Sequence, residues 1–239
     1  MDMSAETINR IVELSAVERF QIEGREYSSK KLNLITAPLI AASGVATLTA
    51  IRDYLQKNPD GLDLTKIIVH VAGHDQVNIM SVVDQLQRTR ETFLAAKASH
   101  RSYPFEKYLE QEDFVIAMQS YFVQKVGDVA PLLAVAGGLT DENVASFGDD
   151  GTTQKVMIKQ GILRNVETPV PNPVVLAPFR TFMEVEQPAS KFVYRIKKGR
   201  NGPEMALFEA DGGNWKLDCI DKIKTWLEAE LPTGTVILA

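Results

Sequence analysis

Two histidines and an aspartate form the most metal-like pattern in the sequence. His70 and His74 are four residues apart, and Asp75 follows directly. On a helix this spacing would place both imidazoles on one face, where they could share a zinc ion. The surrounding Ile-Ile-Val-His-Val segment is rich in β-branched residues and predicts a strand that ends in a turn. Four strand residues span about 13 Å, whereas each zinc ligand lies about 2 Å from the metal. We therefore do not expect this pair to chelate zinc.

Carboxylates are concentrated in two glycine-containing turns. Asp149 and Asp150 precede Gly151, and Asp211 precedes two more glycines. Such carboxylates could hold Mg²⁺ or Ca²⁺, which would suit a metal-dependent enzyme acting on nucleotides or nucleic acid. Asp-Gly pairs also occur in hairpins and at helix starts for backbone reasons alone. We therefore predict no metal and no other cofactor, with Asp149, Asp150 and Asp211 as the weak candidate ligands.

The sequence contains no recognisable nucleophilic machinery. Neither Gly-x-Ser-x-Gly nor a phosphate-binding Gly-x-x-x-x-Gly-Lys-Ser/Thr occurs. His100 lies in a polar stretch that is typical of a solvated loop, although it could belong to a polar site. The single cysteine, Cys219, lies within an apolar helical pattern and is predicted to be a buried thiol. These observations favour a protein without enzymatic activity and leave the question open.

A basic segment is the most distinctive charge feature. No acidic residue occurs between Glu186 and Glu204, and the five cations there are Lys191, Arg195, Lys197, Lys198 and Arg200. On a strand, Lys191, Arg195 and Lys197 would share one face, opposite Phe192, Tyr194 and Ile196. Such a face could follow a nucleic-acid backbone or bind an acidic protein. The alternative is an ordinary solvated sheet face.

The elements that must position these residues follow from hydrophobic periodicity. Helices are predicted at 4–17, 47–57, 106–124, 128–138 and 214–231, with one further turn over 140–147. Strands are predicted at 20–22, 26–27, 66–71, 77–82, 89–98, 154–159, 180–186, 191–198, 204–209 and 235–238, and the four prolines of 168–178 restrict that stretch to edge or extended backbone. Because strands come in blocks, the predicted fold class is α+β, with mostly antiparallel sheets packed by four to five helices.

Length and composition limit the possible classes. The 239 residues, 45% of them apolar, predict one domain, with two intimate subdomains meeting near residues 147–152 as the alternative. No membrane span or signal peptide is expected, so the predicted location is the cytoplasm. The net charge of −5 argues against strong non-specific DNA binding.

Two stretches resemble the YfdQ-like family of phage and prophage proteins, whose function is unknown. The first is Thr92-Phe-Leu-Ala-Ala-Lys97 followed by Phe105-Glu-Lys-Tyr-Leu-Glu-Gln-Glu-Asp-Phe-Val-Ile116. The second runs from Pro171-Asn-Pro-Val-Val-Leu-Ala-Pro-Phe-Arg-Thr-Phe182 to Phe192-Val-Tyr-Arg-Ile196 and Leu207-Phe-Glu209. The resemblance implies a mobile-element protein made in the host cell cytoplasm, and it carries over no residue role.

The resulting functional hypothesis is a non-enzymatic phage accessory protein that binds a partner of DNA metabolism, or DNA itself. A self-assembling phage protein, with the proline-rich segment as an arm, is the first alternative, and the metal-dependent enzyme is the second. The predicted partner is therefore a protein or a second copy of the chain, with nucleic acid possible and no membrane.

Overall fold

The computed structural model describes residues 4–31, 38–85, 87–139, 148–149, 154–159, 165–169 and 172–239. Contacts divide the chain into an N-terminal unit, Met1–Leu39, and a C-terminal unit, Ile40–Ala239. The expected boundary region, 147–152, lies mostly outside the described residues, so the two-subdomain alternative stays a prediction. No helix in the described part of the chain is long and apolar enough to cross a membrane.

The N-terminal unit holds one helix and one hairpin. Helix α1 (Ala5–Ser15) begins after Ser4, whose hydroxyl accepts a hydrogen bond from the Thr7 amide at 3.2 Å. Strands β1 (Arg19–Ile22) and β2 (Arg25–Ser28) pair antiparallel across a tight turn. These elements confirm the predicted ones. Every side chain described in this unit is solvent-exposed, so it has no core of its own.

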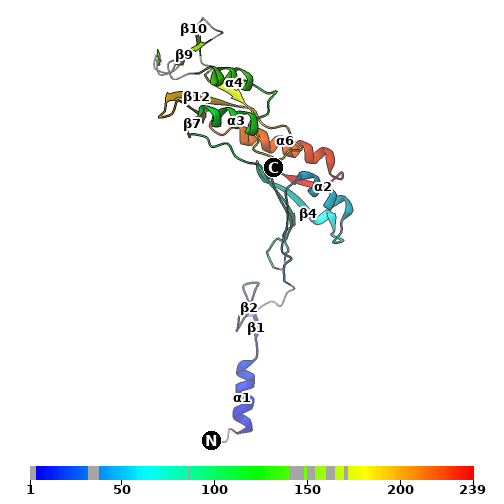
Figure 1. Ribbon diagram of the computed structural model, residues 1–239. Helices are drawn as coiled ribbons and strands as arrows, with labels where there is room; N and C mark the ends of the chain where they lie inside the picture. Colours follow the sequence, from blue (N-terminus) through cyan, green and yellow to red (C-terminus); the bar gives the residue numbers. More distant parts are fainter. Residues whose placement is uncertain are drawn as a thin grey trace. The chain divides into compact units, whose positions relative to one another are not determined.

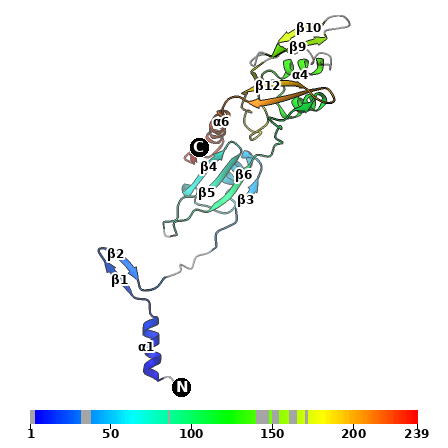
Figure 2. The same cartoon turned by 90° about the vertical axis from the view of Figure 1, so that its left-hand side faces the viewer.

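A five-stranded sheet forms one part of the C-terminal unit, in the order β14-β4-β5-β6-β3 (Figure 2). Its strands are β3 (Ser43–Val45), β4 (Ile67–Gly73), β5 (Gln76–Ser81), β6 (Thr92–Lys97) and β14 (Val236–Leu238). The central strands pair antiparallel, whereas the two edge strands join in parallel. Helices α2 (Leu48–Lys57) and α6 (Trp215–Glu230) supply Leu48, Ile51, Ile223 and Leu227, which pack with Val69, Val77, Ile79 and Leu94 into the β4–β6 core.

A four-stranded antiparallel sheet forms the second part, in the order β11-β12-β13-β7. Its strands are β7 (Leu109–Glu110), β11 (Val174–Leu176), β12 (Ser190–Lys198) and β13 (Pro203–Glu209). Helices α3 (Gln111–Tyr121) and α4 (Val129–Gly138) lie against it (Figure 1). They bury Phe114, Met118, Leu132 and Val135 against Phe192, Tyr194, Ile196, Met205 and Leu207, which together form the β12–β13 core.

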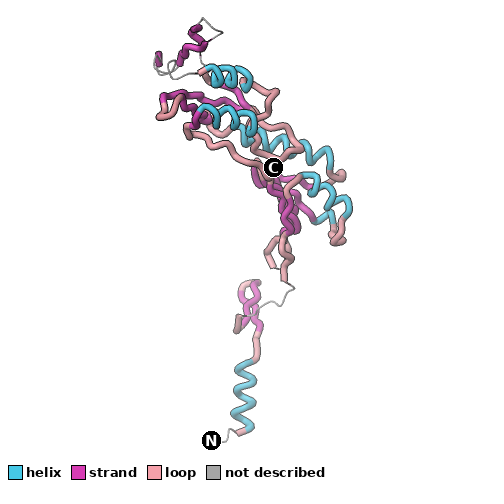
Figure 3. The backbone as a smooth tube through the Cα atoms, in the orientation of Figure 1, coloured by secondary structure: helices cyan, strands magenta, loops and turns pink. Residues whose placement is uncertain are grey.

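Three further short strands, β8 (Gly148–Asp149), β9 (Gln154–Lys159) and β10 (Asn165–Pro169), pair antiparallel in sequence order, and a 3-10 helix, η1 (Leu64–Lys66), precedes β4. Helices and mostly antiparallel strands alternate in blocks along the chain (Figure 3). The fold is α+β, as predicted. The predicted extra turn at 140–147 lies outside the described residues.

Three sequence predictions about single elements are wrong. Helix α3 starts at Gln111 and not near residue 106, because Leu109 and Glu110 pair with β13 and Glu106 has a φ of 65°. Residues 180–186 are not a strand. Their backbone turns around the side chain of Gln187, which accepts hydrogen bonds from the amides of Arg180 and Thr181 at 2.9 and 3.2 Å and donates one to the Phe182 carbonyl at 3.0 Å.

The third wrong prediction concerns α6. Helical periodicity over 214–231 predicts a core stripe of Leu217, Ile220, Ile223, Leu227 and Leu231, but the Leu217 side chain is 63% exposed. The helix buries Trp215 and Cys219 in its first turns and then Ile223 and Leu227. The stripe therefore begins at Trp215, because that indole packs against Arg180 and fixes how the helix is rotated.

Candidate functional site

The predicted division of β12 into a basic and an apolar face is confirmed. Phe192, Tyr194 and Ile196 are almost fully buried, while Lys191 and Lys197 are exposed and Arg195 is half-buried. The strand alternates in this way because its inner side chains fill the β12–β13 core. Lys198 and Arg200 follow as exposed residues at the turn into β13. All five predicted cations therefore lie on one strand and its turn.

Aromatic side chains lie on the same outer face, which the sequence reasoning missed. Val193 is paired with Phe208 across the strands, and both are half-buried. The ring of Tyr108 contacts Phe208 edge-on, with 6.3 Å between centroids, and the Lys197 ammonium lies 4.1 Å from the Tyr108 centroid. The register between β12 and β13 places Phe208 beside the cations, and the sequence does not display that register. The outer face thus combines cations with exposed ring surface.

The outer face also carries two acidic side chains, Glu204 of β13 and its cross-strand partner Glu110 of β7. Glu204 is paired with Lys197 across the strands, and their charged atoms are 3.0 Å apart. This ion pair reduces the net charge near the turn but leaves Lys191, Lys198 and Arg200 as cations with no ion pair among the described residues. The outer face of the sheet is therefore net positive although the whole chain is acidic.

Of the three weak metal candidates, Asp211 is the one whose carboxylate contacts the structure describes. Asp211 starts α6: its carboxylate accepts hydrogen bonds from the amides of Gly213 and Trp215 at 3.0 and 3.3 Å. Asp149 lies on β8, and Asp150 lies outside the described residues. Among the described residues no group of three or more histidine, cysteine or acidic side chains could hold a metal ion. The carboxylate of Asp211 is thus engaged by backbone amides.

The histidines and the cysteine have separate environments. His70 is half-buried on β4, as its strand prediction required, and His74 follows that strand in the turn. The His74 ring meets the Trp215 ring edge-on at 4.8 Å, and burial lowers the pKa of His74 below its ordinary value. Cys219 is fully buried, as predicted, and burial raises the pKa of its thiol. A buried thiol with a raised pKa is a poor nucleophile.

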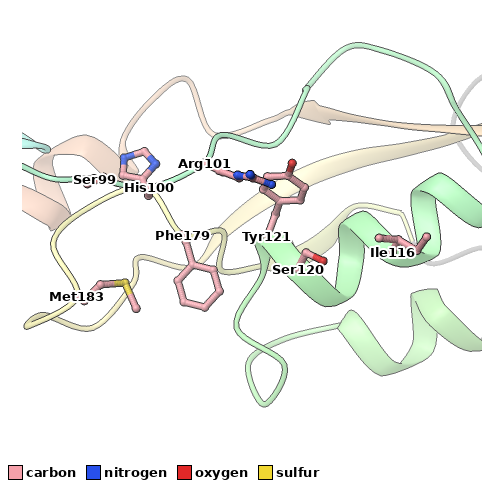
Figure 4. Close-up of a pocket in the computed structure, with 8 residues that line it drawn as sticks. All are labelled: Ser99, His100, Arg101, Ile116, Ser120, Tyr121, Phe179 and Met183. Carbon is pink, nitrogen blue, oxygen red and sulfur yellow. The ribbon is translucent and has the colours of Figure 1, made fainter.

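His100 lines a pocket of about 400 Å³, and is not simply part of a solvated loop (Figure 4). Three segments form the pocket: the loop after β6, the last turns of α3, and the turn that follows β11. Its lining residues are Ser99, His100, Arg101, Ile116, Ser120, Tyr121, Phe179 and Met183. The sequence offered no signal for this pocket, because its walls come from three separate parts of the chain.

A buried arginine connects the two cores, and the sequence analysis missed it. Arg180 is 6% exposed and its guanidinium lies 3.7 Å from the centre of the Trp215 ring. It donates hydrogen bonds to the Pro188 carbonyl at 3.0 Å and the Ser190 hydroxyl at 2.7 Å, and it pairs with Glu209 at 3.3 Å. Burial lowers the pKa of Arg180 to about 10. In the sequence, the one indication of this buried group is that Arg180 is a single cation inside the apolar run 174–182.

The contacts of Arg180 make it a structural group. Its planar face is covered by Trp215, and its donors are directed at groups on the segment between β11 and β12, on β12 itself, and at the end of β13. Its neighbour Thr181 donates a hydrogen bond to the His74 carbonyl at 2.5 Å, which adds a link to the turn after β4. This cluster therefore holds the two sheets of the C-terminal unit together.

Comparisons of the chain with protein-family models, with curated proteins and with solved structures find no match. The resemblance to the YfdQ-like family stays a prediction. The residues of the outer face and of the pocket are therefore the basis for a functional proposal.

Proposed function

We propose that the protein is a non-enzymatic binding protein whose partner is single-stranded nucleic acid, bound on the outer face of β12 and β13. The observation that supports this most directly is the combination of three cations with the half-buried rings of Tyr108 and Phe208 on one face. Proteins that bind single strands without sequence preference combine a basic surface along the backbone with aromatic rings on which bases stack. The cations would contact phosphates, and the two rings would contact bases.

The overall acidity sets the expected strength of this binding. With a net charge of −5, the rest of the chain repels a polyanion, so only the local basic face favours contact. We expect affinity that falls steeply with salt, because neutralising each phosphate releases bound counterions. In the phage or prophage setting predicted from the resemblance, this activity would serve DNA metabolism in the host cytoplasm.

The test is fluorescence anisotropy with a labelled single-stranded oligonucleotide, titrated at several salt concentrations. The variant replaces Lys191, Lys197 and Lys198 with glutamine. Because each phosphate contact contributes a slope of about 0.7 to the dependence of log K on log salt, losing three contacts should reduce that slope by roughly 2. Glutamine removes the charge, keeps a polar side chain that is one atom shorter, and places no new carboxylate beside Glu204.

The matched control replaces three exposed lysines elsewhere, Lys57, Lys66 and Lys125, with glutamine. The two sets are alike, since each contains one lysine paired with a carboxylate, Lys197 with Glu204 and Lys66 with Asp63. The control variant should bind as the parent protein does. Equal weakening in both variants would show that general charge and not the outer face of β12 and β13 attracts the nucleic acid, and would refute the proposal.

A self-assembling protein is the second candidate, and one observation in the N-terminal unit favours it. The apolar stripe of α1 is exposed, with Ile8, Ile11 and Val12 between 47% and 61% accessible. A helix of 11 residues with no core is marginal in water by itself. Within the proline-rich segment, β11 packs on the chain's own core through Val174 and Leu176, so this part is not free to pack on a neighbour. Light scattering at high concentration decides the point, and a monomer would contradict self-assembly.

A further inference from the structure

The pocket beside His100 has the size and the mixed lining of a small-molecule site. Its volume of about 400 Å³ falls within the range of ligand pockets, which run from about 300 to 1,000 Å³. Figure 4 shows that its polar and apolar groups come from different segments: Ser99, His100 and Arg101 from the loop after β6, and Phe179 and Met183 from the turn after β11. Helix α3 contributes Ile116, Ser120 and Tyr121.

The charge of the lining favours an anion. Arg101 is exposed, and it makes no ion pair or hydrogen bond within the part of the chain that the structure describes. No carboxylate is among the lining residues. The hydroxyls of Ser99 and Ser120 and the imidazole of His100 add further hydrogen-bonding groups. An unpaired guanidinium is suited to a phosphate group, because the planar fork can donate two parallel hydrogen bonds.

The apolar part of the lining favours a flat ring. Phe179 is half-buried, Met183 is 68% exposed and Ile116 is 52% exposed, so apolar surface faces the pocket and solvent together. The ring of Tyr121 is held on its other side by Tyr103, with 6.2 Å between centroids in an edge-on arrangement. A planar aromatic body would cover this surface and stack on a ring, which contributes to binding whatever the base.

We propose that this pocket binds a nucleoside monophosphate, with the phosphate on Arg101 and the base against Phe179 and Tyr121. The site is separate from the outer face of β12 and β13, and the inference does not rest on nucleic-acid binding there. A ligand contacts both Arg101 and the aromatic lining residues only if it carries an anionic group and an aromatic ring. Neither inorganic phosphate nor a nucleoside alone should therefore bind as well as the whole nucleotide.

The experiment is isothermal titration of the full chain with adenosine 5′-monophosphate, adenosine and inorganic phosphate. We expect measurable binding of the monophosphate, and affinity at least about tenfold weaker for each of the two fragments. Equal affinity for inorganic phosphate and the nucleotide would overturn the assignment, because the aromatic wall would then contribute nothing. Absence of binding at millimolar nucleotide would overturn it as well.

Two variants separate the roles of the two walls. Arg101→Gln should weaken the monophosphate about tenfold while leaving adenosine unchanged, because it removes the only cation of the lining. Phe179→Leu should weaken the monophosphate and adenosine alike, since it removes the ring and keeps an apolar side chain. The matched control is Arg88→Gln, an exposed arginine outside the pocket, which should bind as the parent does.

A crossed comparison distinguishes failure of this proposal from failure of the proposed function. The glutamine substitutions at Lys191, Lys197 and Lys198 should leave the affinity for adenosine 5′-monophosphate unchanged. Arg101→Gln should leave the salt dependence of oligonucleotide binding unchanged. If the lysine substitutions abolish nucleotide binding, the nucleotide occupies the basic face and the pocket assignment is wrong.

Discussion

The two sheets of the C-terminal unit have the same construction but different outer faces. Each buries one face under two helices and exposes the other. The outer face of β12 carries three cations and adjoins two aromatic rings, whereas that of β4, β5 and β6 carries the apolar pair Ile68 and Met80 beside His70, Asn78 and Ala95, with Lys97 at a strand end. Folding needs only the inner faces to be apolar, so it does not require the cations. The difference between the outer faces therefore favours a functional role for the cations of β12.

The inner faces of the two sheets should contribute equally to the stability of the fold. Truncating a side chain in either core should therefore give the largest loss of stability. Phe192→Ala and Ile79→Ala remove fully buried groups from the β12–β13 core and the β4–β6 core. We expect each to lower the free energy of unfolding by roughly 3–5 kcal/mol, through lost burial and the cavity that remains. Urea unfolding followed by circular dichroism measures this. A loss below about 1 kcal/mol for one variant would mean that its sheet contributes little to stability.

The second-largest loss of stability is expected from removing the Arg180 cluster, which connects the two sheets. Arg180→Ala removes the guanidinium that lies between Trp215, Ser190 and Glu209. We expect a loss of about 3 kcal/mol, at the low end for a broken buried ion pair, because Glu209 is partly solvated. Arg101→Ala, at an exposed position, is the control and should change stability by less than about 0.5 kcal/mol.

The same variant tests whether the cores unfold together. Trp215 and Trp226 both lie on α6, so tryptophan fluorescence reports on this helix while circular dichroism reports on the whole chain. In Arg180→Ala we expect the two signals to separate, because the cluster that joins the sheets is lost. If they still coincide, packing other than the Arg180 cluster couples the two sheets.

A smaller loss of stability is expected from removing an aromatic ring on the outer face of β12 and β13, and this variant also tests whether bases stack there. Phe208→Ala removes a half-buried ring from the outer face, so it should cost roughly 1 kcal/mol of stability, far less than Phe192→Ala. If bases stack there, single-stranded oligonucleotide affinity should fall at least about fivefold, because a base stacked on an aromatic ring contributes roughly 1–3 kcal/mol. An unchanged affinity would exclude stacking on this ring and leave only the cations to bind the backbone.

The smallest expected effect is a pH dependence at the turn after β4. Burial lowers the pKa of His74, with Asp75 opposing the shift. The folded state therefore disfavours the protonated ring, while the unfolded chain takes up the proton near its ordinary pKa of about 6.5. Stability from this group should be complete above that pH and decline as the pH falls through it. Denaturation at pH 7 and pH 5 should show a smaller difference for His74→Asn than for the parent.

Local periodicity was enough to predict most of the elements. Alternation in 191–198 predicted which side chains of β12 are buried, because a strand directs successive side chains to opposite faces whatever it packs against. The cap at Ser4, the stop after Lys57 and the asparagine-glycine turn before β13 are likewise local effects of backbone geometry. These features depend on neighbours a few residues away, which the sequence displays directly.

The failed predictions all depended on distant partners. Residues 106–110 have helical periodicity. They do not form a helix, because Leu109 and Glu110 pair with β13. Residues 180–186 alternate as a strand would, yet four hydrogen bonds of the Gln187 side chain turn the backbone. In both places long-range contacts outweighed a weak local preference.

The sequence by itself determined the fold class, the faces of the strands and the position of the basic segment, because these follow from the order of neighbouring residues. Only the tertiary structure decided that Tyr108 and Phe208 join the cations, that Arg180 connects two cores, and that Arg101 and Phe179 share a pocket. The physical reason is distance along the chain: these groups are brought together by sheet register and helix packing, which no local pattern encodes.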